Sequence, residues 1–161
     1  MSMLASVALI ATACSAGIVP PAGALGVSER EWPGVLRVTG TIEGTFPDSP
    51  ALVHYAQEFA KRGWSRCPNV PQEWGAVATR ERGEEVTVEV LAAAWVSADR
   101  QSFAELRTRV DRPTSKPVRP GERTEQTFYL DVGQAAALAA VTAGGLQRMC
   151  VAELDRKATS H

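Results

Sequence analysis

One uninterrupted stretch, Glu85 to Ser97, constrains the fold of this chain more than any other. It reads E-V-T-V-E-V-L-A-A-A-W-V-S, with apolar residues at every second position. The opposite face begins polar and becomes apolar, in the order Thr87, Glu89, Leu91, Ala93 and Trp95. A period of two is typical of a β-strand. The pattern therefore predicts a central strand that is half covered at its start and buried on both faces at its end.

The N-terminal residues 1–24 have the character of a secretory signal peptide. They carry no charged side chain, and their apolar run, 4–11, is too short to span a bilayer. A pair of helix-breaking prolines precedes Ala22 and Ala24, which have the small-residue spacing of a cleavage site. We therefore expect cleavage after Ala24, which leaves 25–161 as one secreted domain without a transmembrane span.

A second interpretation of the N-terminus places a lipid on Cys14. The residues before it, Ile10-Ala11-Thr12-Ala13, are similar to the small-residue box that precedes the acylated cysteine of bacterial lipoproteins. This alternative predicts a lipid-anchored protein instead of a freely secreted one.

Size and charge limit the class of protein. Removing 24 residues from 161 leaves 137, enough for one domain with its own core. The chain has 17 basic and 18 acidic side chains, a formal net charge of −1. This near-neutral balance argues against nucleic acid as a partner.

Two cysteines remain in the expected mature chain, Cys67 and Cys150. An even number of cysteines in an exported protein predicts a disulfide. The sequence holds only two histidines, too few to complete a zinc site or to activate a cysteine nucleophile by any recognisable pattern. We therefore expect a disulfide-stapled domain with no metal and no cofactor.

An amphipathic helix is predicted for residues 50–62. Ser49 is suited to cap its N-terminus, Pro50 fits the first turn, and Gly63 supplies a stop. The apolar residues recur at helical spacing, at Leu52, Tyr55, Ala56 and Phe59.

Alternation predicts further strands before and after the central one, at 35–46, 74–80, 103–110 and 124–132, with turns at 81–84 and 98–100. The C-terminal third permits two interpretations. A short helix at 134–143 followed by a strand at 146–154 gives an α+β fold, a mostly antiparallel sheet of about five to six strands packed against helix 50–62. Two strands turned at Gly144-Gly145 give an Ig-like β-sandwich with an inserted helix.

The segment Val118-Arg119-Pro120-Gly121-Glu122, followed by the strand Thr127 to Val132, resembles part of the Ig-like secreted proteins of mycobacteria and other Gram-positive bacteria. The likeness covers about a quarter of the chain, and helix 50–62 departs from that pattern. The resemblance implies an immunogenic secreted protein with a sandwich fold.

Residues that could carry catalysis are scarce. The only histidines are His54, beside the apolar stripe of the helix, and His161 at the end of the chain. No phosphate loop, nucleophile elbow or zinc-protease motif occurs. The sequence therefore favours a non-catalytic protein over two alternatives, a small secreted hydrolase that uses scattered carboxylates and a protease inhibitor that presents a rigid loop.

Two features could bind a partner. Trp64 and Trp74 flank the Cys67 loop and could line a groove. The proline-rich connection 111–122 is expected to be exposed and extended, and it carries three basic residues, Arg112, Lys116 and Arg119. The leading hypothesis is an exported domain that binds at the cell envelope, either to an anionic component or to another protein.

Overall fold

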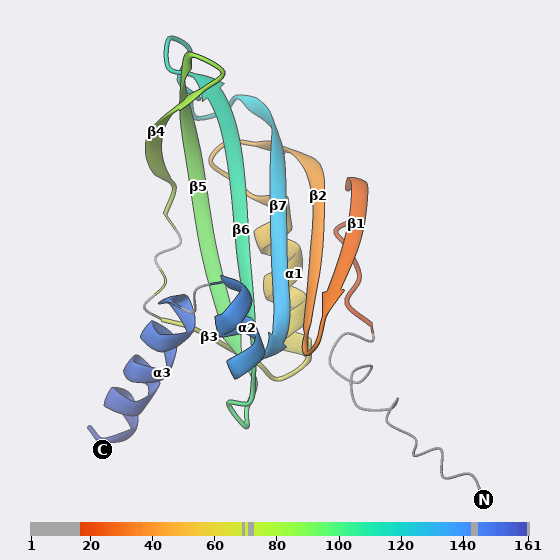
Figure 1. The fold of residues 1–161 in the computed structure, drawn as a ribbon, viewed down its shortest axis with the longest axis vertical. Helices are drawn as coiled ribbons and strands as arrows, with labels where there is room; N and C mark the ends of the chain where they lie inside the picture. Colours follow the sequence, from red (N-terminus) through yellow and green to blue (C-terminus); the bar gives the residue numbers. More distant parts are fainter. Residues whose placement is uncertain (1–16, 69, 71–72, 143–144, 161) are drawn as a thin grey trace, which may run out of the picture.

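Figure 1 shows the fold of the computed structural model, an antiparallel sheet with helices packed on it. In the described residues the sheet has seven strands, and there are three helices. The structure describes residues 17–68, 70, 73–142 and 145–160. The elements are β1 (Leu25–Trp32), β2 (Val35–Thr45), α1 (Pro50–Lys61), β3 (Ser65–Arg66), β4 (Gly75–Glu81), β5 (Glu84–Val96), β6 (Ser102–Pro113), β7 (Arg123–Gln134), α2 (Ala135–Thr142) and α3 (Gly145–Ala158). The strand order is β1-β2-β7-β6-β5-β3, with β4 also paired to β5. The predicted α+β fold with a mostly antiparallel sheet is therefore confirmed.

The two faces of the sheet are covered by different helices. In Figure 1, α1 lies behind the sheet, and α2 lies in front of its lower end. The predicted central strand, now β5, passes between these layers at its C-terminal end, where Trp95 packs into the α1 core and Val96 packs in a second cluster with Leu138 of α2. Its first two residues are exposed and the next two half-buried, whereas its last four are all buried, so the predicted increase in burial along the strand is confirmed. The middle of the sheet, however, is formed by β7 and β6.

Helix α1 forms where its capping residues predict it. The Oγ of Ser49 accepts a hydrogen bond of 3.2 Å from the backbone N–H of Leu52, and proline occupies the first turn. Tyr55 and Phe59 are buried against the sheet. The chain leaves the helix at Gly63, whose φ of +72° suits a residue without a Cβ.

The hairpin between β4 and β5 turns at the predicted place. Arg82 and Gly83 both have positive φ, 51° and 83°, and Glu81 pairs with Glu84 across the turn. Two residues with positive φ give a turn whose twist matches that of the two strands.

The C-terminal third differs from the prediction. The short helix is confirmed as α2, but the predicted strand at 146–154 is wrong, because these residues belong to α3. The Ig-like sandwich is wrong too, since all the strands described belong to one sheet. Cys150 and Leu154 stand four residues apart, which places them on one face of a helix, and both join the cluster beneath α2.

The predicted disulfide is present between Cys67 and Cys150. The sulfur atoms are 2.11 Å apart and the Cα atoms 5.0 Å apart. Both cysteines are buried, in the same cluster as Val96 and Phe103. The bond therefore fastens α3 to the segment that follows β3.

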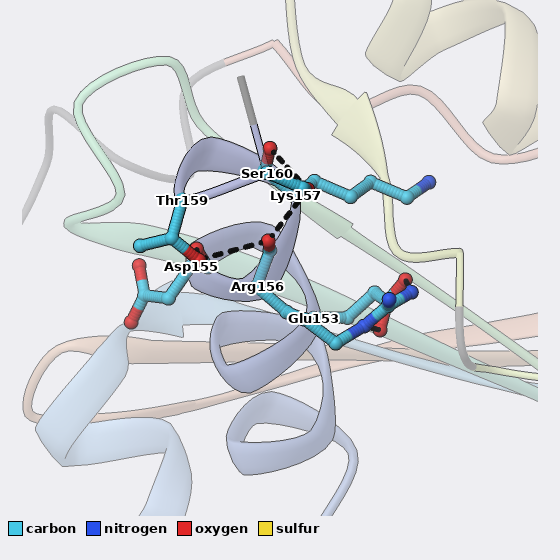
Figure 2. Close-up of polar contacts among 6 residues, drawn as sticks. All are labelled: Glu153, Asp155, Arg156, Lys157, Thr159 and Ser160. Carbon is cyan, nitrogen blue, oxygen red and sulfur yellow. Dashed lines mark hydrogen bonds and ion pairs between the residues drawn. The ribbon is translucent and has the colours of Figure 1, made fainter.

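Polar side chains complete the C-terminal end of α3, as Figure 2 shows. The hydroxyls of Thr159 and Ser160 donate to backbone carbonyls of the last turn, and Arg156 forms two hydrogen bonds to Glu153. The carbonyls at a helix end lack partners within the helix, so these hydroxyls satisfy them locally. Asp155, one turn earlier, pairs with Arg100 of the β5–β6 loop at 2.5 Å, which is a second tether for α3.

Two further differences concern the strands. Strand β1 was not predicted, because its sequence has no alternation and seven of its eight residues are exposed at the edge of the sheet. Strand β6 continues to Pro113, so the residues 111–113 are paired with β5 instead of belonging to a connection. The remaining connection, 114–122, is exposed but contains turns, since Lys116 bonds back to Pro113 and Glu122 bonds back to Arg119.

Candidate ligand-binding groove

An open groove of about 910 Å³ lies beside the N-terminus of α1. Four segments that are distant in sequence line it. They are residues 21–22, the β2–α1 loop with the first turns of α1, residues 73–74 before β4, and single residues of β2 and β5. No single stretch of sequence contains the groove, because it forms only when the sheet brings these segments together.

The groove is mainly apolar. Its floor includes Ile42 of β2 and Leu91 of β5, both on the sheet face that α1 covers. Leu52 and Val53 of α1 form one wall. Val53 is 56% exposed, so a branched apolar side chain at this wall remains largely in contact with solvent. Burying such a side chain under a ligand is favourable by roughly 1.5 to 3 kcal/mol when burial is complete.

Trp74 also lines the groove, and two contacts hold it in place. Its ring lies 5.1 Å from that of Phe46 with an angle of 51° between their planes. Its Nε1–H donates a hydrogen bond of 2.7 Å to the carbonyl of Pro47. The polar atom of the indole is thereby satisfied, and the half-buried ring lines the groove with its apolar surface.

The β2–α1 loop rests on buried polar side chains of the sheet. The Nε2 of Gln126 donates to the carbonyl of Asp48 at 2.8 Å, and the Oγ of Ser49 donates to Thr108 at 3.5 Å. Gly44 permits this close approach, since a Cβ there would lie 2.7 Å from Pro50 and 2.8 Å from the Gln126 amide. Alternation predicts that Gln126 and Thr108 face inward, but no sequence signal assigns them this role under the groove.

The residues before β1 supply the remaining wall. Pro21 is buried and Ala22 lies beside it in the groove. This segment is attached to α1 by two hydrogen bonds. The Nε2 of His54 donates to the Val19 carbonyl at 2.6 Å, and the Nη2 of Arg62 donates to the Gly17 carbonyl at 2.7 Å. His54 therefore has a structural contact with the N-terminal segment.

Trp64 does not share the groove with Trp74. Trp64 follows the C-terminal end of α1, and its ring packs on that of Phe59 at 5.0 Å. Trp74 instead contacts Pro47, in the loop that precedes the N-terminal end of α1. A helix of this length separates its ends by about 18 Å. The two tryptophans that flank the Cys67 loop in sequence are therefore at opposite ends of the helix, and Trp64 extends the core.

The predicted basic surface is also divided. Arg112 lies in strand β6 and forms an ion pair with Glu122, which leaves it half-buried. Lys116 and Arg119 are exposed in the connection 114–122. None of the three lines the groove.

A second, smaller hollow of about 290 Å³ lies on the other face of the sheet. It is lined by Arg37, Val90, Arg107, Arg109, Tyr129 and Asp131. Arg37 makes two hydrogen bonds to Asp131, at 2.6 and 2.9 Å, and these bonds raise the pKa of the guanidinium above its usual value. Arg109 is paired in the same way with Asp111. The guanidinium groups of Arg37 and Arg109 are therefore each paired with a carboxylate, Asp131 in the lining and Asp111 outside it.

Two facing carboxylates of β6 and β7 are also engaged by arginine side chains. Glu105 and Asp131 face each other on β6 and β7 and are both buried. Asp131 holds Arg37, and Glu105 lies 4.0 Å from Arg107. Among the described residues no group of three histidine, cysteine, aspartate or glutamate side chains is placed to hold a metal ion.

None of the helices in the described ranges has the length and apolar character needed to cross a membrane. Comparison of the chain with protein-family models, with curated proteins and with solved structures finds no match.

Proposed function

We propose that this protein is an exported, non-catalytic domain that binds a small ligand with an apolar body at the cell envelope. The observation that carries the proposal is the groove beside α1, whose volume of about 910 Å³ falls within the range of small-molecule sites, roughly 300 to 1,000 Å³. Its apolar walls and floor, with few polar side chains, are typical of such sites.

Binding is a better explanation of the groove than catalysis. Its one histidine, His54, is bonded to a backbone carbonyl of the N-terminal segment. A general base must reach the proton that it abstracts, and a nucleophile needs a base beside it. The hydroxyl of Ser49, a potential nucleophile in the lining, already accepts the bond of the helix cap and donates to Thr108.

The disulfide supports an exported location, because such bonds persist in oxidising compartments. The contacts of residues 17–24 help to decide where the exported chain is cleaved. Cleavage after Ala24 would remove Pro21 and Ala22 from the groove, together with the two hydrogen bonds to α1. We therefore favour processing before Gly17 over the predicted cut after Ala24. Cys14, which lies outside the described residues, is the cysteine at which the lipid-anchored alternative places the new N-terminus.

The proposal is tested by placing a charge in the groove. Val53 in the groove and Val77 on β4 are almost equally exposed, 56% and 59%, so substitution of either leaves stability nearly unchanged. Octyl glucoside, titrated into the full-length chain below its micelle concentration, serves as the apolar probe. V53D should weaken binding at least tenfold by calorimetry, and V77D should not. Equal affinities for the two variants, or no binding to the unmodified chain, would refute the proposal.

A second candidate is an anionic partner at the connection 114–122. Lys116 and Arg119 are exposed there, and neither forms an ion pair with another described residue. If this surface retains the protein on anionic envelope polymers, K116S/R119S should reduce retention, and so should added salt, because exposed charges are screened over about 10 Å at 0.1 M. Retention that survives both changes would exclude this surface.

A further inference from the structure

We infer that the ligand of the groove carries a positive charge next to its apolar body. This inference rests on the proposed function and specifies the chemical class of ligand, a low-molecular-mass amphiphile with an ammonium or guanidinium head.

The charged residues of the groove are both acidic. Among the lining residues that the structure describes, Asp48 and Glu73 are the two that carry a formal charge at neutral pH. Both are exposed. Neither forms an ion pair with another described residue, although acidic side chains elsewhere in the fold commonly pair with arginine, as at Glu43, Asp111, Glu122 and Asp131.

These two acidic residues come from two loops that are joined by a hydrogen bond. Glu73 directly precedes Trp74, and Asp48 directly follows Pro47. The hydrogen bond from the Trp74 indole to the Pro47 carbonyl joins the two loops, so both acidic residues stand next to this junction. Two like charges on residues beside one junction, with no ion pair to another described residue, produce a local negative potential, which attracts a cation.

The aromatic side chains at the junction favour the same ligand. The N–H of the Trp74 indole is already bonded to the Pro47 carbonyl, so the ring offers its carbon atoms to a ligand in the groove. A cation within about 6 Å of an indole face is attracted by the ring quadrupole, and ammonium groups are bound in this way by clustered aromatic rings. Phe46, 5.1 Å from Trp74, supplies a second ring. Leu52 and Val53 then remain for the apolar part of the ligand.

Three ligands that share one chain length test this inference on the full-length protein. Octyltrimethylammonium, octyl glucoside and octyl sulfate are titrated by calorimetry below their micelle concentrations. We expect the ammonium to bind at least fivefold more tightly than the glucoside, and the sulfate to bind more weakly than both. The preference for the ammonium should decrease between 20 and 500 mM salt, because the two carboxylates are exposed.

Substitution identifies the source of the preference. D48N/E73Q should remove the preference, so that this variant binds the ammonium and the glucoside with equal affinity. Glu125, an exposed acidic residue of β7 outside the groove, provides the matched control, and E125Q should keep the full preference. A preference that persists in D48N/E73Q, or equal binding of the three ligands, would overturn the inference while the proposed function stands. Failure of all three ligands to bind would instead overturn the proposed function.

Discussion

The indole Nε1–H of Trp74 donates to the carbonyl of Pro47 at 2.7 Å, and this bond joins two loops that are 27 residues apart in the sequence. One loop leads into α1 and the other leads into β4. The bond thus joins two segments that line the groove, and Asp48 and Glu73 are the sequence neighbours of the bonded residues. A single side chain both shapes the proposed site and contributes to its wall.

The two roles of Trp74 can be separated by substitution. W74F keeps an aromatic ring and removes the hydrogen bond, which typically contributes about 1 kcal/mol to stability. W74A removes the ring as well. We expect W74F to bind octyltrimethylammonium within about threefold of the unmodified chain, and W74A to bind it at least tenfold more weakly. Equal losses in calorimetry would mean that the loop junction, and not the ring, determines the affinity.

Phe59 should be the most costly position to truncate on α1. Its ring is 1% exposed and lies 5.0 Å from the rings of both Trp64 and Trp95. F59A leaves a cavity between helix and sheet, for which we expect a loss of about 3 to 5 kcal/mol in urea unfolding. Lys61 is the control, since its side chain is 73% exposed and its ion pair with Glu58 is a surface pair. K61A should change stability by less than about 0.5 kcal/mol. A loss for K61A as large as that for F59A would show that the packed face of α1 is misassigned.

The elements that the sequence predicts are those with strong local signals. Helix α1 has a cap, a proline in its first turn, a continuous apolar stripe and a glycine stop, and the inward faces of β6 and β7 alternate without interruption. Helix α3 was missed because the glycine pair before it is also typical of a hairpin turn. Strand β1 was missed because an exposed edge strand needs no apolar face.

The groove could not be predicted in this way, because its geometry depends on contacts between distant segments. Trp64 and Trp74 stand close in the sequence and on either side of Cys67, which suggested one shared surface. The helix end fixes Trp64 against Phe59, and the bond to Pro47 fixes Trp74 beside the opposite end. Composition and spacing contain no information about either contact.

Tyr55 should make the domain sensitive to alkali. Its side chain is fully buried, its hydroxyl has no hydrogen-bond partner among the described residues, and burial raises its pKa above the usual value of 10.0. Above pH 10 the tyrosine of the unfolded chain loses its proton while that of the folded chain keeps it, so stability falls as pH rises from about 10 through the raised pKa.

Y55F tests this account by urea unfolding at pH 7 and pH 10.5. At pH 7 the variant should be equal to the unmodified chain or up to about 1 kcal/mol more stable, because an unsatisfied buried hydroxyl is removed. At pH 10.5 it should lose less stability than the unmodified chain. Y129F, on the other face of the sheet, leaves Tyr55 in place and should keep the full alkaline loss. A strong loss for Y55F at pH 7 would show that the hydroxyl has a partner in solution.

Reduction of the disulfide should destabilise the domain by about 4.5 kcal/mol in the chain-entropy account, because Cys67 and Cys150 are separated by 83 residues. Urea midpoints with and without a reductant measure this difference, and mass after alkylation reports the state of the thiols. An oxidised sample in which both Cys67 and Cys150 are alkylated, or a midpoint that does not change with reductant, would contradict the tether between α3 and the segment after β3.

The N-terminal segment provides the last prediction, which separates the two forms of export. Deletion of residues 1–16 should leave the fold and the groove intact, whereas deletion of 1–24 removes the buried Pro21 and the bonds from His54 and Arg62. Since each hydrogen bond contributes about 1 kcal/mol, we expect the longer deletion to be less stable by at least about 2 kcal/mol. It should also bind octyl glucoside more weakly, because the wall formed by Pro21 and Ala22 is lost.

The intact mass of exported material then decides which form the cell makes. A mass that corresponds to a chain whose first residue is Gly17 or an earlier one agrees with retention of residues 17–24. A diacylglycerol adduct on Cys14 would identify the lipid-anchored form. A mature chain that begins at Leu25, with stability and affinity equal to those of the shorter deletion, would mean that the contacts of 17–24 with α1 make no contribution to the exported protein.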